Sequence, residues 1–434
     1  MHAIAPRPDP ASLSGHAARP AWPGAPVAEP AGAPSGSPEG GESVTRIVDD
    51  VIHKALADGA SDIHIEPHTD RIVVRTRLDG FLATVRELPR PLHAAVVSRV
   101  KIMASLDIAE RRVPQDGHIR LRAGGSEAHL RVSTLPSRHG EKVVLRLFER
   151  DQGLRSLDAL GLSGDQRAAL EAMLAHPHGM MLVTGPTGCG KTTTLRACIS
   201  RLRAEHLNII SLEDPIEYEM LGVTQIQIHE RVGLTFAEAL RAVLRQDPDI
   251  IMVGEIRDPE TADVVMRASL TGHLVLSTVH TNDAPSAILR LHNLGVDPYL
   301  VATSTIGVVA QRLVRLVCPG CRVPEAAAAA VTALFPLLAD AALWRGRGCA
   351  DCRQTGYLGR TGIYEILPLD GGARALPGRE DGRERFRDAV RVAGLPTLFE
   401  DGLRKVAAGL TTLAEVLRVA PSPRPLAGVG AAVG

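Results

Sequence analysis

The chain of 434 residues has few aromatic side chains and no excess of charge of either sign. Phe, Trp and Tyr together make up only 3%, so the base-stacking surfaces of proteins that bind single-stranded nucleic acids are not expected. Lys and Arg number 49, as do Asp and Glu, which gives a formal net charge of zero. The composition therefore offers no electrostatic reason to bind nucleic acid or an anionic membrane.

Long apolar runs are also absent from the sequence. No stretch reaches the roughly twenty apolar residues of a transmembrane helix. The nearest candidate, Ala326–Trp344, is rich in Ala and is interrupted by Pro336 and Asp340. The first residues lack the charged and then apolar pattern of a secretory signal. We therefore expect a cytoplasmic protein, in which the six cysteines need not form disulfides.

What the chain does contain is a phosphate-binding loop. Residues 185–192 read Gly-Pro-Thr-Gly-Cys-Gly-Lys-Thr and fit the pattern G-x-x-x-x-G-K-S/T. The apolar run Met180–Thr184 precedes them and the helix-compatible stretch Thr192–Arg203 follows, which favours a true P-loop over a Gly-rich turn. In such a loop the backbone N–H groups surround the phosphates, while Lys191 reaches the β- and γ-phosphates and Thr192 ligates Mg²⁺. The predicted nucleotide-binding residues are Gly185, Pro186, Thr187, Gly188, Cys189, Gly190, Lys191, Thr192 and Thr193.

A glutamate follows another short apolar run. Ile250–Val253 is typical of a buried strand, and Gly254 and Glu255 come directly after it. Ligands of parallel sheets bind at the carboxyl ends of the strands. We therefore predict that Glu255 orients the waters of the metal and polarises the attacking water. The alternative is a carboxylate that only caps the next helix.

Polar residues also lie beside two further apolar runs. The segment Glu213–Tyr218 has three carboxylates within five residues, which repel one another unless a cation such as Mg²⁺ is near; a solvated acidic turn is the alternative. His280 lies just after the run Leu274–Thr278, where a sensor of the γ-phosphate would lie. His273 precedes that run and would lie at the opposite end of the strand or in the entry loop, with a structural histidine as the alternative.

The chain before the P-loop predicts a disordered tail and an α+β domain. Residues 1–42 are dominated by Pro, Ala, Gly and Ser and cannot bury enough apolar surface to fold. Apolar residues recur at helical spacing after Ser43, the expected N-cap, and Gly59 ends that helix. Strands are expected around Ile63 and Ile65 and over residues 71–78, 118–122, 127–134 and 142–148, with a helix over residues 91–106 and a linker near residues 149–153.

The chain after the linker alternates apolar strands with helices from residue 154 to residue 310. This alternation is typical of a parallel sheet covered by helices. The expected strands are 207–212, 250–253 and 274–278, in addition to the strand before the P-loop.

Two C-x-x-C pairs follow the predicted sheet. Cys318 and Cys321 form the first pair, and Cys349 and Cys352 form the second. Four thiolates suit one tetrahedral Zn²⁺ with no open ligand position, so the site would be structural. A redox pair is the competing interpretation. Cys198 lies inside the helix after the P-loop, and we expect it to be packed in the core.

Four segments occur in the order of the Walker A, Asp box, Walker B and His box motifs, and with them the chain resembles the type II/type IV secretion ATPases. They are Gly185–Thr192, Glu213–Tyr218, Gly254–Asp258 and Thr271–His280. The resemblance extends to Ser61–Pro67 and Thr397–Val406. It implies a homo-hexamer at the cytoplasmic face of the inner membrane, in which each protomer joins a PAS-like domain to a RecA-like ATPase domain.

The resemblance also implies roles for individual residues. Glu255 takes the position of the catalytic glutamate and Glu213 that of the Asp-box glutamate, while His273 and His280 take those of the His-box histidines. Arg131 and Arg146 match the arginine fingers of the family, although without the family a surface salt bridge would be the simpler interpretation.

One departure from the family pattern concerns Cys189, which stands where the family usually has Ser. At the start of a helix and near Lys191, its thiol is expected to be acidified and reactive.

The predicted fold is therefore of the α/β class, with a RecA-like P-loop ATPase domain after a PAS-like α+β domain. A small zinc-binding insert and a helical C-terminal tail complete it. The predicted parts are a disordered tail (1–42), the PAS-like domain (43–150), the ATPase domain (154–310), the tetracysteine subdomain (311–368), a helical subdomain (369–420) and a second disordered tail (421–434).

The expected function is ATP hydrolysis that drives pseudopilus assembly in type II secretion, with ATP, Mg²⁺ and structural Zn²⁺ as cofactors. The paired cysteines point to fibre extension, because the assembly ATPases of the family carry them and its retraction ATPases lack them. Expected partners are copies of the same chain and inner-membrane platform proteins, with only peripheral membrane contact and no nucleic acid. The alternatives are a type IV pilus assembly ATPase, a RecA-like nucleic-acid motor and a regulatory module that binds nucleotide without turnover.

Overall fold

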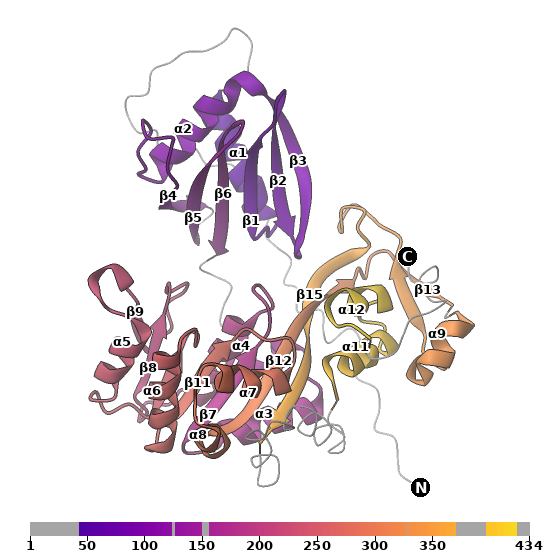
Figure 1. The fold of residues 1–434 in the computed structure, drawn as a ribbon. Helices are drawn as coiled ribbons and strands as arrows, with labels where there is room; N and C mark the ends of the chain where they lie inside the picture. The colour runs from indigo at the N-terminus through magenta and orange to yellow at the C-terminus, as the bar shows by residue number, and fades with distance from the viewer. Residues whose placement is uncertain (1–42, 124–125, 150–155, 327, 370–395, 423–434) are drawn as a thin grey trace. The chain divides into compact units, whose positions relative to one another are not determined.

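The computed structural model describes residues 43–123, 126–149, 156–326, 328–369 and 396–422 (Figure 1). These residues form two compact units, the first containing residues 43–78 and 82–149 and the second containing residues 79–81 and the described residues from 156 onward. The tail predicted to be disordered over 1–42 lies outside the described residues, as does most of the tail predicted over 421–434. Among the described helices, none combines the length and hydropathy that a membrane span requires.

The first unit is a six-stranded sheet with two helices. Helix α1 (Val44–Ala57) begins after Ser43, as expected, and Gly59 follows its end with a φ of 68°. The strand order is β3-β2-β1-β6-β5-β4, and the β1–β2, β1–β6, β4–β5 and β5–β6 pairs are antiparallel. The strands are β1 (Asp62–Pro67), β2 (Arg71–Leu78), β3 (Phe81–Pro89), β4 (Gln115–Ala123), β5 (Ser126–Ser137) and β6 (Gly140–Glu149), and the second helix is α2 (His93–Met103), which follows a short 3₁₀ turn.

Strand β3 was not expected from the sequence. The turn Asp79-Gly80 was, and both residues have positive φ values (47° and 86°), as a tight two-residue hairpin requires. The strand that follows is largely exposed, and only Leu88 among its nine residues is buried. An edge strand of this kind carries little of the apolar alternation by which strands are recognised.

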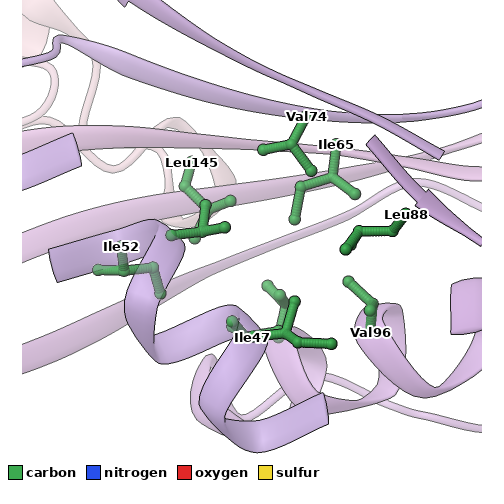
Figure 2. A pocket seen from close by; sticks show the side chains of 10 residues that line it. Ile47, Ile52, Ile65, Val74, Leu88, Val96 and Leu145 are labelled. Carbon is green, nitrogen blue, oxygen red and sulfur yellow. The ribbon is translucent and has the colours of Figure 1, made fainter. Parts of the chain in front are cut away.

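The two helices and the sheet enclose an apolar core with one small cavity. Figure 2 shows side chains from α1, α2 and the strands pointing toward it, among them Ile52, Ile65 and Leu145. The cavity measures about 10 Å³ and is lined by hydrophobic residues only, so it is too small and too apolar to hold an ordered water. The core is therefore closely packed where the helices meet the sheet.

The second unit contains a seven-stranded sheet in the order β15-β12-β7-β11-β10-β8-β9. All neighbouring pairs are parallel except β12–β15, which is antiparallel. The strands are β7 (Gly179–Thr184), β8 (Ile209–Glu213), β9 (Thr224–Gln227), β10 (Ile250–Val253), β11 (Leu274–Val279), β12 (Thr305–Val317) and β15 (Tyr357–Pro368). The predicted parallel sheet is thus confirmed, and the strand over 250–253 has the expected bounds.

Helices cover both faces of this sheet. Alternate residues of β7 enter two separate cores: Met180 and Leu182 pack with residues of α5, α6 and α7, while Met181 and Val183 pack with residues of α3 and α4. Strands buried on both faces read as continuous apolar runs, which explains why they are recognisable in the sequence. The helices are α3 (Gly164–Leu174), α4 (Lys191–Leu202), α5 (Phe236–Val243), α6 (Pro259–Leu270), α7 (Ala284–Asn293) and α8 (Pro298–Ser304).

The sheet crosses the domain boundary that the sequence predicted between residues 310 and 311. Strand β12 runs through that position, and β15 pairs with it from the far side of the cysteine-containing segment. The boundary at 310 is therefore wrong, because residues 305–317 form one continuous strand of the sheet. The cysteines lie in an insertion between β12 and β15.

The insertion and the C-terminal region are small elements attached to this sheet. The insertion contains the two-stranded sheet of β13 (Arg322–Glu325) and β14 (Leu343–Gly346) with the short helix α9 (Ala329–Leu334). Two helices, α11 (Leu398–Ala407) and α12 (Leu413–Val419), pack beside β15 and β12, as Figure 1 shows. Helix α11 begins with a capping box between Thr397 and Glu400. The helical subdomain was predicted over 369–420, and residues 370–395 of it lie outside the described residues.

Replacing Leu145 by Ala should weaken the core of the first unit. The side chain is 1% exposed and borders the small cavity, so its truncation should lower the free energy of local unfolding by about 2–5 kcal/mol. Hydrogen exchange of the β1 and β6 amides, followed by mass spectrometry in the full chain, measures this. Ile102→Ala is the control, because Ile102 is 49% exposed. Equal acceleration of exchange in both variants would contradict the packing described here.

Candidate nucleotide-binding and catalytic site

The P-loop connects the end of β7 to the start of α4. Gly185, Gly188 and Gly190 have φ values of 152°, 78° and 92°, and Gly190 is the N-cap of α4. A Cβ added to Gly185 would lie 2.5 Å from Sγ of Cys189 and 2.6 Å from the carbonyl oxygen of Gln311. Only glycine permits this conformation and this approach to β12, so the loop is held in one shape by packing from beneath.

The outer part of the loop is open to solvent. Pro186, Thr187 and Gly188 are exposed, as are Thr192 and Thr193 at the start of α4. A helix N-terminus preceded by a glycine-rich turn presents free N–H groups and partial positive charge, which suits an anion. These five of the predicted nucleotide-binding residues therefore lie at a surface that phosphate groups can reach, whereas Gly185, Cys189 and Lys191 are buried.

Lys191 lies inside this loop. Its Nζ donates to the carbonyl oxygens of Gly185 (2.8 Å) and Pro186 (3.1 Å) and lies 3.5 Å from Nδ1 of His280. Burial lowers the pKa of Lys191, while the negative charge of Glu255 opposes this change. The ammonium is therefore placed at the base of the anion site and is held there by the loop itself.

Glu255 lies on the other side of the same histidine. Its Oε2 is 3.3 Å from Nε2 of His280, and its Oε1 accepts a hydrogen bond from Arg257. Burial acts to raise the pKa of Glu255, but Arg257 and His280 outweigh it and hold the pKa below the usual value. The carboxylate is therefore ionised at neutral pH, as a group that orients or deprotonates water must be. One imidazole thus bridges Lys191 and Glu255.

Glu213 has a different environment from the one expected. Its Oε1 accepts from Ser211 Oγ and Gln225 Nε2 (both 2.8 Å), and its Oε2 pairs with Arg196 at 3.0 Å. The residue is 4% exposed. The cation that was expected beside the acidic segment is thus the guanidinium of Arg196, which also lies 3.8 Å from Glu217. With both oxygens occupied, Glu213 is built into the end of β8.

His273 lies at the far edge of the sheet from the P-loop. It precedes β11, whose first residue Leu274 pairs with Gly179 at the start of β7. Its Nδ1 is 2.9 Å from the carbonyl oxygen of Ala268, at the end of α6. Within its own chain His273 is therefore not part of the pocket that contains His280, because the two histidines flank opposite ends of one strand. The sequence allowed for this position at the opposite end of the strand, and a catalytic role of His273 stays a prediction.

Arg131 and Arg146 lie opposite each other on β5 and β6 of the first unit. Arg146 is also opposite Asp62 of β1, and its Nε lies 3.0 Å from Oδ1 of that carboxylate. Both arginines are exposed. Two guanidinium groups directly opposite each other in a sheet repel each other. The single carboxylate of Asp62 does not neutralise both, so this row of residues keeps a positive charge that could bind an anion.

Cys189 does not have the environment that was expected. It is 4% exposed and lies under the loop against Gly185. Burial raises the pKa of the Cys189 thiol, and the nearby Lys191 and Arg312 only partly oppose this. The expectation of an acidified, reactive thiol is therefore wrong, because its side chain turns away from the anion site into the protein. Cys198 is fully buried, as predicted.

Sequence reasoning missed the polar residues of β12. Gln311 accepts a hydrogen bond from Thr194 of α4 at 2.7 Å, and Arg312 donates to the carbonyl oxygen of Asn282 at 2.8 Å. Both are buried. The available signal was a Gln-Arg pair within the otherwise apolar run 305–317, since polar residues are rarely buried without a specific partner.

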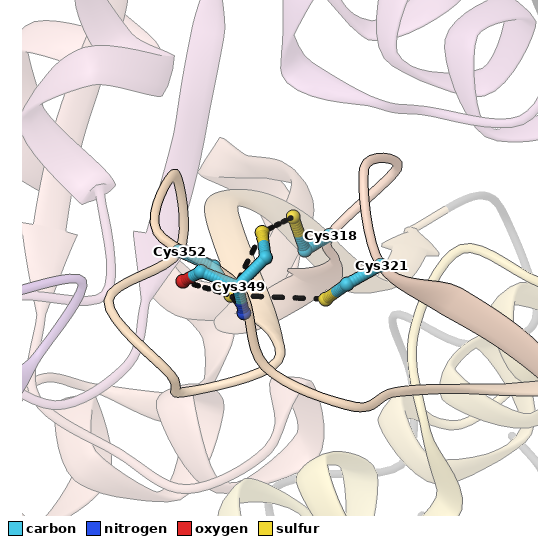
Figure 3. A group of neighbouring side chains, drawn as sticks. All are labelled: Cys318, Cys321, Cys349 and Cys352. Carbon is cyan, nitrogen blue, oxygen red and sulfur yellow. Dashed lines mark hydrogen bonds between the residues drawn. The ribbon is translucent and has the colours of Figure 1, made fainter.

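The four cysteines of the insertion converge on one point, as Figure 3 shows. The sulfur atoms of Cys318 and Cys349 are 3.8 Å apart, those of Cys321 and Cys352 are 3.7 Å apart, and those of Cys349 and Cys352 are 3.6 Å apart. Four thiolates bound at about 2.3 Å to one tetrahedral ion lie about 3.8 Å from one another. The donor set therefore fits a single tetrahedral metal ion.

Backbone groups support the thiolate form of one of these cysteines. The N–H groups of Cys349 and Gly356 donate to Sγ of Cys352 at 3.2 and 3.3 Å. Burial acts to raise the pKa of Cys352, but these donors, together with the thiols of Cys349 and Cys321, bring it to about 6. Such N–H donors around a sulfur orient and stabilise a metal-bound thiolate.

Alkylation should distinguish a buried Cys189 from a reactive one. The thiolate is the nucleophile, and a raised pKa together with burial should make Cys189 react with iodoacetamide at pH 8 at least about a hundredfold more slowly than in urea-unfolded chain. Peptide mass spectrometry measures the rate at each cysteine. Cys198 should be protected to a similar degree and serves as the control. Labelling of Cys189 at the same rate in native and unfolded protein would contradict this structure.

The chain is similar to known proteins over most of its length. Residues 38–418 match the family described as "Type II/IV secretion system protein". The chain is 51% identical over 379 residues to "Type II secretion system protein HxcR" of Pseudomonas aeruginosa, which covers 87% of this chain and 78% of that protein. It is 44% identical over 385 residues to "Type IV pilus assembly ATPase TfpB" of Acinetobacter baylyi, covering 88% and 66% respectively.

A solved structure shares the fold. The structure described as that of the pilus retraction motor PilT with bound ADP has a TM-score of 0.59 and 25% sequence identity, covering 86% of this chain and 97% of that one. The chain therefore belongs to the type II/IV secretion system protein family and is an ATPase of that family.

Proposed function

We propose that this ATPase powers the assembly of a pseudopilus in type II protein secretion, with Lys191, His280 and Glu255 as the centre of its active site. The observation that carries the catalytic assignment is the histidine that contacts both the P-loop lysine and the glutamate at the end of β10. The assignment to type II secretion rests on the 51% identity to a type II secretion protein, against 44% to a type IV pilus ATPase.

The chemistry follows from the residues at this edge of the sheet. Phosphoryl transfer needs positioning and charge stabilisation more than covalent help. The loop N–H groups and Lys191 would bind the phosphates, and the Thr192 hydroxyl would hold Mg²⁺, which neutralises phosphate charge when bound. Glu255 would orient the attacking water, and His280 would lie beside the terminal phosphate. Glu213 would act indirectly, by fixing the end of β8 next to Glu255.

The two arginines of the first unit would complete the site. We propose that Arg131 and Arg146 reach the nucleotide as arginine fingers, because they form an exposed cationic row with a single carboxylate. A planar guanidinium is suited to phosphate oxygens. Since they belong to a separate unit, hydrolysis would depend on how the units and the subunits of a hexamer close, and this would couple ATP turnover to movement.

The setting of the reaction is proposed from the same relationships. The protomers would assemble into a hexamer at the cytoplasmic face of the inner membrane, bound to platform proteins of the secretion system. The four cysteines would hold a structural Zn²⁺ between β12 and β15. The PAS-like character of the first unit is part of this proposal. Genomic neighbours provide a simple test of the pathway, since pseudopilin genes favour secretion and pilus genes favour the type IV alternative.

Glu255→Gln should separate ATP binding from hydrolysis. The amide keeps the size of the side chain but cannot accept a proton, so ATP should still bind while phosphate release falls at least about a hundredfold. Titration with a fluorescent nucleotide measures binding, and a phosphate-release assay measures hydrolysis. Glu171→Gln on α3, where the carboxylate pairs with Arg167, is the control and should leave the rate unchanged. Near-normal turnover of Glu255→Gln would rule out the assigned role.

Metal analysis should find about one zinc per chain in protein purified without added metal or affinity resins. Cys321→Ser should lose the zinc and the exchange protection of the β13 and β14 amides, because three thiolates bind Zn²⁺ much more weakly than four. Cys198→Ala is the control and should keep its zinc. Elemental analysis and hydrogen exchange provide the readouts. A zinc content near zero in the native protein would remove the metal assignment.

A further inference from the structure

Residues 280–284 connect His280 to α7 and are held by buried polar groups. At the start of this segment, the N–H of Thr281 donates to Oγ1 of Thr184, the last residue of β7, at 2.9 Å. The hydroxyl groups of Thr184 and Thr281 are 2.7 Å apart. Thr184 also directly precedes Gly185, so the first anchor ties the segment to the base of the P-loop.

The second anchor is Arg312 of β12. Its Nη2 donates to the carbonyl oxygen of Asn282 at 2.8 Å, and its Nη1 donates to that of Gln311 at 2.9 Å. The guanidinium also packs against Gly185, where an added Cβ would lie 3.1 Å from Nη1. Arg312 therefore touches both the P-loop and the segment that bears His280.

This arginine is costly to bury. It is 6% exposed, and burial lowers its pKa although Cys189, Asp283 and Glu365 oppose this. Within the described part of the chain, no carboxylate oxygen lies within 4.0 Å of a guanidinium nitrogen of Arg312. A buried cation is destabilising unless other contacts replace its lost hydration, and Arg312 donates its hydrogen bonds to the carbonyl oxygens of Asn282 and Gln311. Its presence here points to a function in fixing the backbone that it contacts.

The third anchor is Glu365 of β15. Its Oε1 accepts from the N–H of Ala284 at 2.9 Å and its Oε2 accepts from the N–H of Leu398 at 3.2 Å. Ala284 and Leu398 are the first residues of α7 and α11, whose N–H groups have no partner within their helices. Glu365 is 6% exposed. One carboxylate thus holds the starts of two helices, where the helix dipoles favour negative charge.

Arg312 and Glu365 act on the same segment from neighbouring strands. Glu365 is paired with Ala310 across β12–β15, and Arg312 lies two residues further along β12 on the same face. The carboxylate has one oxygen on the helix that follows the His280 segment and the other on the C-terminal helix α11. Any shift of α11 relative to β15 would therefore move Glu365 and, through it, the start of α7 and the segment that positions His280.

We propose that Arg312 and Glu365 are positioning residues for ATP hydrolysis, which keep His280 between Lys191 and Glu255 and link its position to that of α11. This inference rests on the proposed hydrolysis at the P-loop. Neither residue needs to touch the nucleotide. Their loss should leave phosphate binding by the P-loop intact while it loosens the arrangement around Glu255, so the effect belongs to kcat and not to KM.

The first test is Glu365→Gln in the full chain. The amide can accept one N–H through its oxygen, but its NH₂ group faces the second N–H donor, so one helix start is released. We expect kcat for phosphate release to fall at least about tenfold with KM for ATP changed by less than about threefold.

Glu415→Gln is the matched control. Glu415 is a buried carboxylate of α12 that pairs with Arg315 of β12 and accepts from its N–H at 3.1 Å, but it does not contact residues 280–284. The Glu415→Gln variant should lower the melting temperature as Glu365→Gln does, while its kcat stays within about twofold of the native value. If both variants reduce kcat in proportion to their loss of melting temperature, Glu365 only stabilises the fold and the proposal is overturned.

A second variant, Arg312→Lys, keeps the charge but replaces the fork by a single ammonium that cannot bind both carbonyl groups in the same geometry. It should also lower kcat with little change in KM. Both residues act through one segment, so their effects should not multiply. The kcat of the double variant Arg312→Lys with Glu365→Gln should lie within about twofold of that of the slower single variant. Multiplicative losses would show independent effects and contradict the proposal.

The outcomes separate this inference from the function on which it rests. If the native chain releases no phosphate, the proposed function fails. If the native chain hydrolyses ATP and Glu255→Gln does not, while Glu365→Gln and Arg312→Lys retain native kcat, then the active site stands and only the positioning role is lost.

Discussion

The parallel pairing of β7, β11, β10 and β8 is the constraint on which the site depends. Their carboxyl ends meet at one edge of the sheet. The P-loop, His280 and Glu255 follow β7, β11 and β10, and Glu213 is the last residue of β8. These strands are buried on both faces, so a shift in their pairing register would place polar residues in an apolar core. The cores on the two sides of the sheet therefore fix where the catalytic groups can lie.

Buried charge surrounds this edge and carries a cost in stability. Arg196 with Glu213, and Arg312 and Glu365 near α7, are all at most 6% exposed. Removing such groups from water costs several kcal/mol unless hydrogen bonds replace the lost solvation. Glu213 makes its hydrogen bonds with side chains, whereas Arg312 and Glu365 make theirs with backbone groups next to the site. The cost is offset by a rigid arrangement of the segments that bear Glu255 and His280, and rigidity is what phosphoryl transfer requires of a protein.

The insertion with the four cysteines begins where β12 ends. Cys318 follows Val317 directly, while Gln311 and Arg312 of the same strand pack beneath the P-loop. Strand β15 brings the chain back and contributes Glu365. The cysteine cluster and the C-terminal helices are thus attached to the two strands that support the nucleotide loop, which gives these parts of the second unit a direct structural connection to the site.

The sequence by itself determined the features that depend on local patterns. The P-loop, the buried strand before Glu255 and the paired cysteines are recognised from spacing and apolar runs, because each is formed by residues close together in the chain. Only the tertiary structure decided the rest. Three features depend on burial and on strands far apart in sequence. They are the raised pKa of Cys189, the hydrogen bonds of Glu213, and the contacts of Arg312 and Glu365 with residues 280–284. Desolvation and cross-strand contacts are properties of packed surroundings, and no local pattern encodes them.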